Sequence, residues 1–295
     1  MSPPTAAEHV ASHRSAGRFV DVRGQRLFVR EEGEGPPVLL LHGVPSSSFL
    51  YRKMMAPLAQ AGVRAVAFDF PGMGLSAKPR DIAYDWHALA GWLDEVVETL
   101  GLGPVHLVVH DIGGPIGFEW ALDHPSKVAS LTVLNTLLDL ARFSPPFPMW
   151  LYRVPGLRQV VFRTQSTALF VPIMRRQGVA RRDSITPAEV GAYLELLRRD
   201  GGRRSFLAIM AGFDLSPAHG ERLAAGLRAL GETLPMQLIW GRRERAIPEH
   251  QVAFLRRTLP FRATHEVEGA HFLQEDVPEE LAELIAGFAR SGGAG

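Results

Sequence analysis

The stretch at residues 105–117, Val-His-Leu-Val-Val-His-Asp-Ile-Gly-Gly-Pro-Ile-Gly, limits the possible folds of this chain more than any other. Its first five residues form a short run that is typical of a buried parallel strand. Asp111, Gly113 and Gly114 follow, and then an apolar pattern with helical spacing. A strand that turns sharply into a helix needs small residues at the turn, because a Cβ atom would collide with neighbouring backbone. We therefore expect an elbow that exposes the Asp111 side chain above a sheet, at the positive end of the new helix.

The residue at this turn indicates the chemistry. A carboxylate is already ionised at neutral pH and can attack carbon without help from a base, so Asp111 favours alkylation of a carboxylate over acylation of a serine. A plain helix N-cap would explain Asp111 alone, but it would not explain the paired glycines. We interpret Asp111 as a nucleophile.

Further apolar runs predict the fold around the elbow. Short runs at 37–41, 64–70 and 131–135 alternate with helical patterns, which predicts a parallel sheet with helices on both faces. Residues 18–31 predict a β-hairpin that turns at Gly24, and residues 1–16 have the character of a loose leader.

The alternation then stops for almost eighty residues. Between 137 and 214 there is no convincing buried strand, but there are several prolines and Arg-rich helical patterns. We therefore predict a core made of residues 1–136 and 216–295, with a helical cap at 137–215 inserted between the two parts.

Composition narrows the function classes. The formal net charge of +1 gives no reason to expect nucleic acid or an anionic membrane surface as a partner. There is no cysteine, which excludes disulfides and thiol catalysis and fits a reducing cytoplasm. The N-terminus shows no apolar core of signal-peptide length, and no run reaches the length of a membrane span. No group of His and carboxylate residues has metal-ligand spacing, so we expect neither a metal nor another cofactor.

Five motifs in this order resemble the α/β-hydrolase superfamily, and more narrowly its Asp-nucleophile branch of epoxide hydrolases and haloalkane dehalogenases. They are His-Gly-Val-Pro at 42–45, the Asp69-to-Ser76 turn, the elbow at 110–114, the 241–248 loop, and Gly-Ala-His-Phe at 269–272. The resemblance implies an α/β-hydrolase fold with a mostly parallel eight-stranded sheet and an inserted cap.

An ester on Asp111 has to be hydrolysed, which requires a base with a pKa near neutral. His271 is the candidate, since it lies in a loop just after the last strand, and it needs an acidic partner to orient it. The family usually supplies Asp in a Gly-x-x-Asp loop, where this chain has Glu244. The alternative acid position of some dehalogenases corresponds to Asn135, and Asp139 is a reserve candidate. His42 and His110 flank the site and are expected to shape its backbone.

The resemblance also implies the remaining site residues. The backbone N–H groups of Val44 and Ile112 would form the oxyanion hole. Haloalkane dehalogenases generally hold the halide with side-chain donors at these two positions, and neither Val nor Ile has one. Epoxide hydrolases protonate the opened ring with cap tyrosines, and Tyr193 and Tyr152 are the candidates here.

Opening of an epoxide to a diol is therefore the leading prediction, with a small apolar substrate and water as reactants. Haloalkane dehalogenation is the first alternative, and a non-catalytic ligand-binding homologue is the second. A serine esterase is poorly supported because no Ser occupies the elbow. A homodimer is possible.

Overall fold

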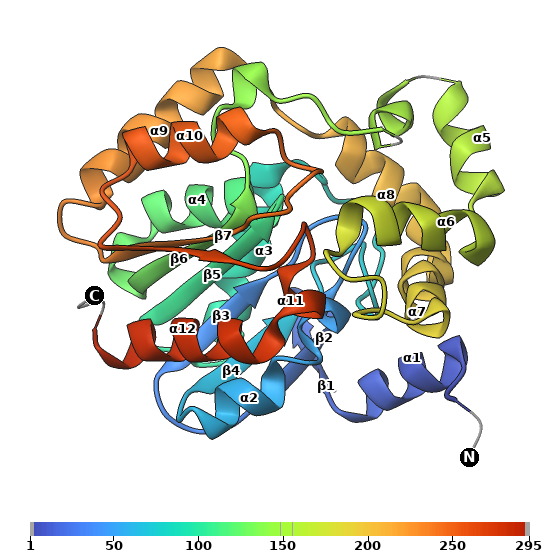
Figure 1. Cartoon of the computed structure of the whole chain (residues 1–295), viewed down its shortest axis with the longest axis horizontal. Coiled ribbons are helices and arrows are strands. Elements are labelled where there is room, and N and C mark those ends of the chain that lie inside the picture. The colour runs from blue at the N-terminus through green and yellow to red at the C-terminus, as the bar shows by residue number, and fades with distance from the viewer. Residues whose placement is uncertain (1–2, 148, 155, 293–295) are drawn as a thin grey trace.

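The computed structural model describes residues 3–147, 149–154 and 156–292, and its centre is a single eight-stranded sheet (Figure 1). The strands are β1 Arg18–Val22, β2 Gln25–Glu32, β3 Pro37–Leu41, β4 Arg64–Phe68, β5 Val105–Asp111, β6 Val128–Thr136, β7 Met236–Gly241 and β8 Ala263–Val267. Their order across the sheet is β1-β2-β4-β3-β5-β6-β7-β8. Only the β1–β2 and β2–β4 pairings are antiparallel. The prediction of a mostly parallel eight-stranded α/β sheet is thus confirmed.

Helices cover both faces of this sheet, as the alternating pattern predicted. In Figure 1, α4, α9 and α10 lie above the sheet, and α2 and α12 run along its lower side. The helices of this layer and the short helices between strands are η1 Ser48–Tyr51, α2 Met55–Gln60, α3 Trp86–Thr99, α4 Gly113–Asp123, η2 Pro125–Lys127, α9 Pro217–Leu230, α10 Glu249–Thr258, α11 Leu273–Asp276 and α12 Pro278–Arg290.

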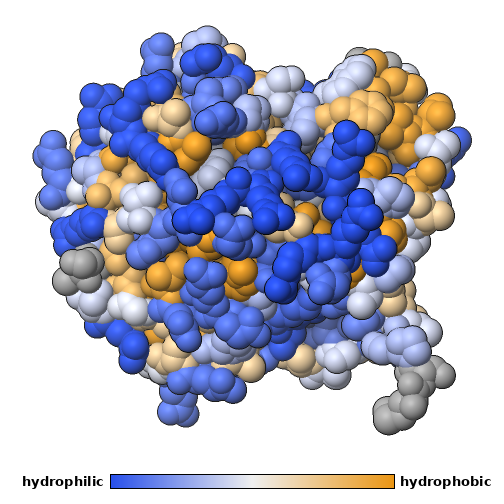
Figure 2. All heavy atoms as spheres, in the orientation of Figure 1, coloured by the Kyte–Doolittle hydropathy of each residue, from blue (hydrophilic) through white to orange (hydrophobic). Residues whose placement is uncertain are grey.

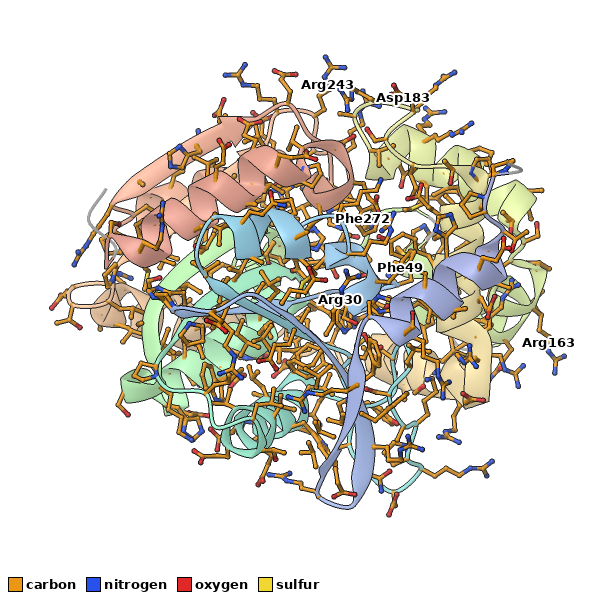
Figure 3. The ribbon with its side chains drawn as sticks, turned by 90° about the horizontal axis from the view of Figure 1, so that it is seen from below. Arg30, Phe49, Arg163, Asp183, Arg243 and Phe272 are labelled. Carbon is orange, nitrogen blue, oxygen red and sulfur yellow. The ribbon has the colours of Figure 1, made fainter. Side chains whose placement is uncertain are left out.

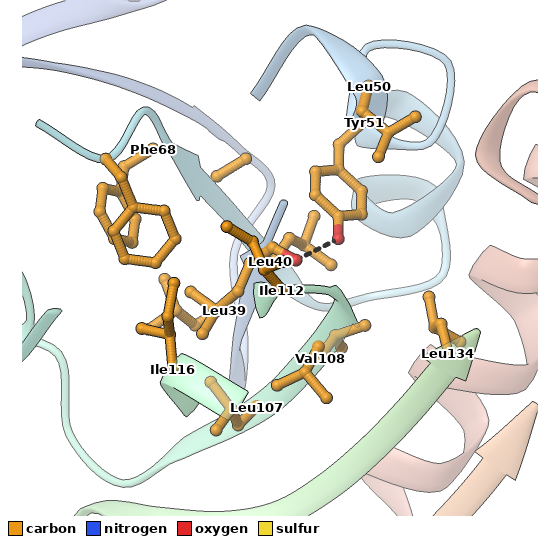
Figure 4. Close-up of a cluster of buried hydrophobic side chains, with 14 of the residues drawn as sticks. Leu39, Leu40, Leu50, Tyr51, Phe68, Leu107, Val108, Ile112, Ile116 and Leu134 are labelled. Carbon is orange, nitrogen blue, oxygen red and sulfur yellow. Dashed lines mark hydrogen bonds between the residues drawn. The ribbon is translucent and has the colours of Figure 1, made fainter. Parts of the chain in front are cut away.

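The middle strands are buried from end to end because helices pack on both of their faces. Every residue of β5 is buried, and so is every residue of β7. Around β3 and β5 the core holds Leu40 and Val108, and the Tyr51 hydroxyl in this core donates to the carbonyl oxygen of Leu41 at 2.8 Å (Figure 4). A buried hydroxyl keeps its hydrogen bond in this way, since an unpaired one would cost about 1–3 kcal/mol.

A run of helices separates β6 from β7 and lies at the right of Figure 1. No described residue between 137 and 215 belongs to a strand. The helices are η3 Leu140–Arg142, η4 Met149–Arg153, α5 Leu157–Thr164, α6 Thr167–Ile173, η5 Met174–Gly178, α7 Pro187–Arg198, η6 Arg199–Gly201 and α8 Gly202–Ala211. We refer to residues 137–215 as the cap segment. Its status as a domain with these boundaries stays a prediction.

The expectation of a loose leader at 1–16 is wrong for its larger part. Helix α1 (Ala6–Ser15) begins with a capping box in which Thr5 and Glu8 each bind the other's backbone N–H. The helix packs against α7. Its buried His13 lies within hydrogen-bond distance of the Ser48 hydroxyl, at 3.2 Å. The Thr-x-x-Glu pattern at 5–8 was a visible start signal for a helix.

A buried cluster of charges ties the cap segment to the core. Arg52 contacts Glu189 of α7 at 2.6 Å and the two carboxylate oxygens of Glu275 in α11 at 2.5 and 2.8 Å. The side chain of Glu275 is fully buried, and those of Arg52 and Glu189 are about one-tenth exposed. Lys53 makes a further contact with Glu275 at 2.8 Å. Burial alone would raise the pKa of Glu189, but Arg52 and the Thr186 N–H lower it to about 2.

Substitution of Arg52 by Leu should destabilise the protein by about 3 kcal/mol, because it leaves buried carboxylates with less positive charge beside them. Chemical denaturation measures this loss. The matched control is Arg18→Leu, which removes the ion pair of a half-exposed arginine with Glu31 and should cost under ~1 kcal/mol. Equal losses for the two variants would contradict the structural role of the cluster.

Candidate active site

The elbow adopts a strained conformation at Asp111. This residue ends β5 directly before α4 and has φ of 52°, in the left-handed region that residues other than glycine rarely occupy. Three glycines leave room for it. A Cβ atom at Gly114 would lie 1.9 Å from the Thr136 hydroxyl oxygen, and one at Gly43 would lie 2.1 Å from Oδ1 of Asp111. A Cβ atom at Gly113 would lie 2.7 Å from the Leu41 carbonyl oxygen. The turn therefore has no space for larger residues at Gly43 or at either glycine of the Asp-x-Gly-Gly sequence.

The carboxylate of Asp111 is held in one orientation. The Val44 N–H donates to Oδ1 at 2.8 Å, and the Ile112 N–H also hydrogen-bonds to the carboxylate. The Thr136 hydroxyl donates to the Asp111 carbonyl oxygen at 2.5 Å and fixes the turn itself. The two N–H groups expected to form an oxyanion hole thus point at the carboxylate of the candidate nucleophile, whose Oδ2 also faces another partner.

That partner is His271, which lies in the loop between β8 and α11. Its Nε2 is 3.5 Å from Oδ2 of Asp111, and its Nδ1 is 2.9 Å from Oε2 of Glu244. Glu244 follows β7, and its other oxygen accepts the N–H groups of Ala246 and Ile247 at 2.5 and 3.0 Å. The loop after β7 folds the longer Glu side chain back onto its own backbone. The structure therefore brings Asp111, His271 and Glu244 together.

The three side chains form a buried group with alternating charge. Burial alone would lower the pKa of His271, but the Glu244 charge and the hydrogen bonds to both carboxylates raise it to about 10. Burial would also raise the pKa of Asp111 and of Glu244, yet the neighbouring imidazole and backbone N–H groups lower both. At neutral pH the resting site therefore holds an imidazolium between two carboxylates.

Two further histidines shape the backbone around this group. His110 is buried and lies 2.8 Å from the carbonyl oxygen of His271 through its Nε2. Burial and the nearby His271 lower the pKa of His110 to about 4, so the ring is neutral and its Nε2–H donates to that carbonyl. His42 accepts the Phe70 N–H at Nε2 and contacts the Gly43 carbonyl through Nδ1.

The other acid positions considered from the sequence lie elsewhere. Asn135 donates to the carbonyl oxygen of Ala270 at 2.8 Å and accepts the Gly241 N–H at 3.0 Å, so it joins the loops that carry Glu244 and His271. Asp139 faces Arg142 at 3.7 Å and lines a separate cavity. Of the candidate acids, Glu244 is therefore the one in contact with His271.

A cavity of about 580 Å³ opens above the Asp111 carboxylate. Most of its wall is apolar and comes from the cap segment, with Phe143, Leu151, Phe170 and Met210 among the lining side chains. Tyr152 also lines it, and the Tyr152 hydroxyl accepts a hydrogen bond from the side-chain amide of Gln165, another wall residue. Nothing in the sequence marked Gln165 as a site residue, since a lone Gln in a helical region is commonplace.

The structure does not support the expectation that Tyr193 faces the substrate. Its side chain is buried but does not line the cavity. Its hydroxyl donates to Glu275 at 2.6 Å within the Arg52 cluster, and its ring packs edge-on against Phe49. Tyr193 thus joins α7 to the core, away from the candidate nucleophile.

One group of side chains has ligand-like spacing that the sequence analysis did not notice. His87, Glu119 and Asp123 place one ligand atom each within 4.8 Å of one another. Glu119 already contacts Arg222 and His219, both at 2.5 Å, so its charge is balanced within the protein. We assign no metal to this group.

Comparison with known proteins agrees with the fold. The family model for the alpha/beta hydrolase fold matches residues 36–278. A haloalkane dehalogenase of Sphingobium indicum is 31% identical, over 92% of this chain and 95% of its own length. A cis-3-alkyl-4-alkyloxetan-2-one decarboxylase of Xanthomonas campestris is 32% identical, over 91% and 94%.

Solved structures give the same result. Cfl2 of Burkholderia cenocepacia has a TM-score of 0.81 at 27% identity and covers 93% of this chain and 95% of its own. The epoxide hydrolase VrEH1 of Vigna radiata has a TM-score of 0.74 at 24% identity, over 93% and 98%, a likeness that shows the fold alone.

With a family model that spans most of its length, this chain belongs to the α/β-hydrolase fold family. Within that family it belongs to the Asp-nucleophile branch that contains haloalkane dehalogenases and epoxide hydrolases. None of the helices in the described part of the chain is long and apolar enough to cross a membrane.

The contact between Glu244 and His271 predicts a titration near pH 10 for the imidazole in the ligand-free protein, well above its usual value near 6.5. Glu244→Gln should lower this pKa, because it removes a negative charge that stabilises the imidazolium. Histidine NMR signals followed against pH measure the shift. Asp139→Asn is the matched control and should leave the titration unchanged; the reverse pattern would make Asp139 the partner of His271.

Proposed function

We propose that this protein is a hydrolase that forms a covalent ester on Asp111 and opens an epoxide to a vicinal diol. The observation that carries the proposal is that the two carboxylate oxygens of Asp111 have different partners. Oδ1 is fixed by the Val44 N–H, and Oδ2 faces the His271 imidazole under an apolar cavity. A fixed, ionised and partly desolvated carboxylate is a suitable nucleophile toward a strained ring.

In the first step Oδ2 attacks a ring carbon, the carbon–oxygen bond breaks, and the ring oxygen becomes an alkoxide. Tyr152 gives its proton to that alkoxide and regains one from the His271 imidazolium. The Asp111 ester has no charge, so one of the two carboxylates that raised the pKa of His271 is lost and the imidazole can remain neutral.

In the second step neutral His271 takes a proton from water, and the hydroxide attacks the ester carbon of Asp111. The N–H groups of Val44 and Ile112 stabilise the resulting oxyanion. The ester then breaks, and His271 returns the proton to the departing diol oxygen. The carboxylic acid left on Asp111 gives its own proton to His271, which restores the resting charges. The sum is one epoxide and one water consumed for each diol released.

Tyr152 supports the epoxide as substrate. Because its hydroxyl oxygen accepts from Gln165, its own proton is available to a group in the cavity. Proton donation of this kind contributes about 10²- to 10⁴-fold to rate. Val44 and Ile112 line the same cavity with aliphatic side chains, which cannot donate to a departing halide. Loss of one such donor typically costs about 10²- to 10³-fold.

Halide displacement is the second candidate, and the sequence relatives favour it, since several are haloalkane dehalogenases at 31% identity. The same ester mechanism would apply without a proton donor for the leaving group. The decarboxylase relative acts, by its name, on another strained ring, an oxetan-2-one. A panel of alkyl epoxides, haloalkanes and dialkyl oxetanones therefore separates the three chemistries.

The covalent step is testable by intact-mass measurement. In His271→Gln the ester should form and persist, because the base that hydrolyses it is gone. The added mass should equal that of the whole epoxide, and peptide mapping should locate it at Asp111. Asp111→Asn in the same background should give no adduct. A stable adduct on any other residue would rule out Asp111 as the nucleophile.

Two tyrosine variants test the proton donor. Tyr152→Phe should slow epoxide opening about 10²- to 10⁴-fold in single-turnover kinetics, because the alkoxide then lacks its proton source. Tyr193→Phe is the matched control: it loses the bond to Glu275 and should lower thermal stability while changing the rate much less. If Tyr193→Phe instead slowed ring opening and Tyr152→Phe did not, the assignment of the donor would be reversed.

A further inference from the structure

The cap segment carries an unusual concentration of exposed apolar side chains. Among described residues, every large apolar side chain that is at least two-fifths exposed lies between 147 and 169. They are Phe147, Trp150, Leu157, Val160 and Leu169, with exposed fractions of 62, 43, 40, 55 and 60%. Figure 2 shows apolar surface gathered at the upper right, where Figure 1 places α5. We call these five side chains the cap patch.

The cap patch is continuous with the mouth of the cavity. Phe147 and Leu169 are exposed and also line the cavity. Leu157 and Val160 lie on α5, whose Val161 and Thr164 belong to the cavity wall. An apolar molecule that lies against the cap patch would therefore meet a mostly apolar surface on its way into the cavity.

The charge of this region is strongly one-sided. From 140 to 182 the sequence has no Asp, Glu or Lys but eight arginines: Arg142, Arg153, Arg158, Arg163, Arg175, Arg176, Arg181 and Arg182. Arg158 and Arg163 are on α5 with the cap patch, and neither forms an ion pair with any residue that the structure describes. Arg163 points away from the ribbon in Figure 3. The net charge of +1 for the whole chain, on which the expectation of no membrane partner rested, hides this local excess.

Exposed apolar side chains beside unpaired arginines restrict the partner. A second copy of this chain that met the cap patch through a twofold axis would place arginine-rich surface against arginine-rich surface, which repels. A lipid surface that contains anionic headgroups satisfies both features, since the arginines face phosphates while Trp, Phe, Leu and Val enter the acyl boundary. We propose that the cap patch docks on an anionic lipid surface, with the mouth of the cavity toward the bilayer.

This placement extends the substrate class. A substrate that partitions into the bilayer would reach the Asp111 carboxylate without crossing water, so we expect lipophilic, long-chain alkyl epoxides to be preferred over water-soluble ones. This second part rests on the proposed function, whereas the docking does not.

Sedimentation of the full chain with vesicles tests the docking directly. The protein should bind vesicles of phosphatidylcholine with added phosphatidylglycerol and should bind pure phosphatidylcholine vesicles much more weakly. Arg163→Gln should lower the partition coefficient on the anionic vesicles about fivefold, and Val160→Ser about tenfold. Neither side chain lines the cavity, so activity on a soluble substrate should not change.

The matched controls are Arg290→Gln, at the end of α12 near the C-terminus in Figure 1, and Gln159→Ser, an exposed polar change on α5 itself. Both should bind vesicles as the wild type does. Equal losses in Arg163→Gln and Arg290→Gln, binding to neither vesicle type, or burial of the cap patch in a dimer would overturn the proposal. Vesicle binding without activity on any epoxide would leave the docking intact and contradict the proposed function.

Discussion

The strained turn at Asp111 is the constraint on which the site depends. Its left-handed backbone and the close approach of Gly43 and Gly114 place the carboxylate where two backbone N–H groups reach it. The remaining members come from loops that follow β7 and β8. In a parallel sheet these loops meet at one edge, which is why His271, more than a hundred positions further along the chain, can contact Asp111. The price in backbone strain is ~1–3 kcal/mol, and the surrounding core sustains it.

Charge balance explains why three ionised side chains tolerate burial together. Each carboxylate accepts backbone N–H bonds as well as facing the imidazolium, so its remaining lone pairs are satisfied. Asn135 and His110 donate neutral hydrogen bonds to the backbone carbonyls of Ala270 and His271. These bonds hold the His271 loop in place and add no charge to the site. The local charge is one negative unit at rest, and it would stay at one negative unit after proton release and alkylation of Asp111, because Glu244 keeps its charge. In the proposed cycle the distribution of charge therefore changes while its sum does not.

The sequence predicted those parts of the structure that depend on local backbone chemistry. The elbow, the hairpin at 18–31 and the alternation of strands and helices are each visible in a short window, and the order of motifs indicated which loops would meet. Side-chain direction in the cap segment was not predictable. Tyr193 lies on a helix as expected, but the face it uses is set by Arg52 and Glu275, which are far away in the sequence. Tyr152 and Gln165 likewise meet only through tertiary packing, and Glu244 reaches His271 only because its loop folds back.

Tyr193, which lies away from the cavity, takes part in the buried charge cluster around Arg52. Glu275 is four residues after His271, in the short helix α11 that ends the loop of the candidate base. Arg52 and Tyr193 hold this helix to α7. The Glu275 carboxylate thus contacts the cap segment and lies close in sequence to His271. The Phe272 N–H also donates to the Gly178 carbonyl oxygen of the cap segment at 2.7 Å, a second link at the same loop. The cap segment that walls the cavity and the loop that carries His271 are therefore joined at two places, the buried Glu275 carboxylate and the Phe272–Gly178 hydrogen bond.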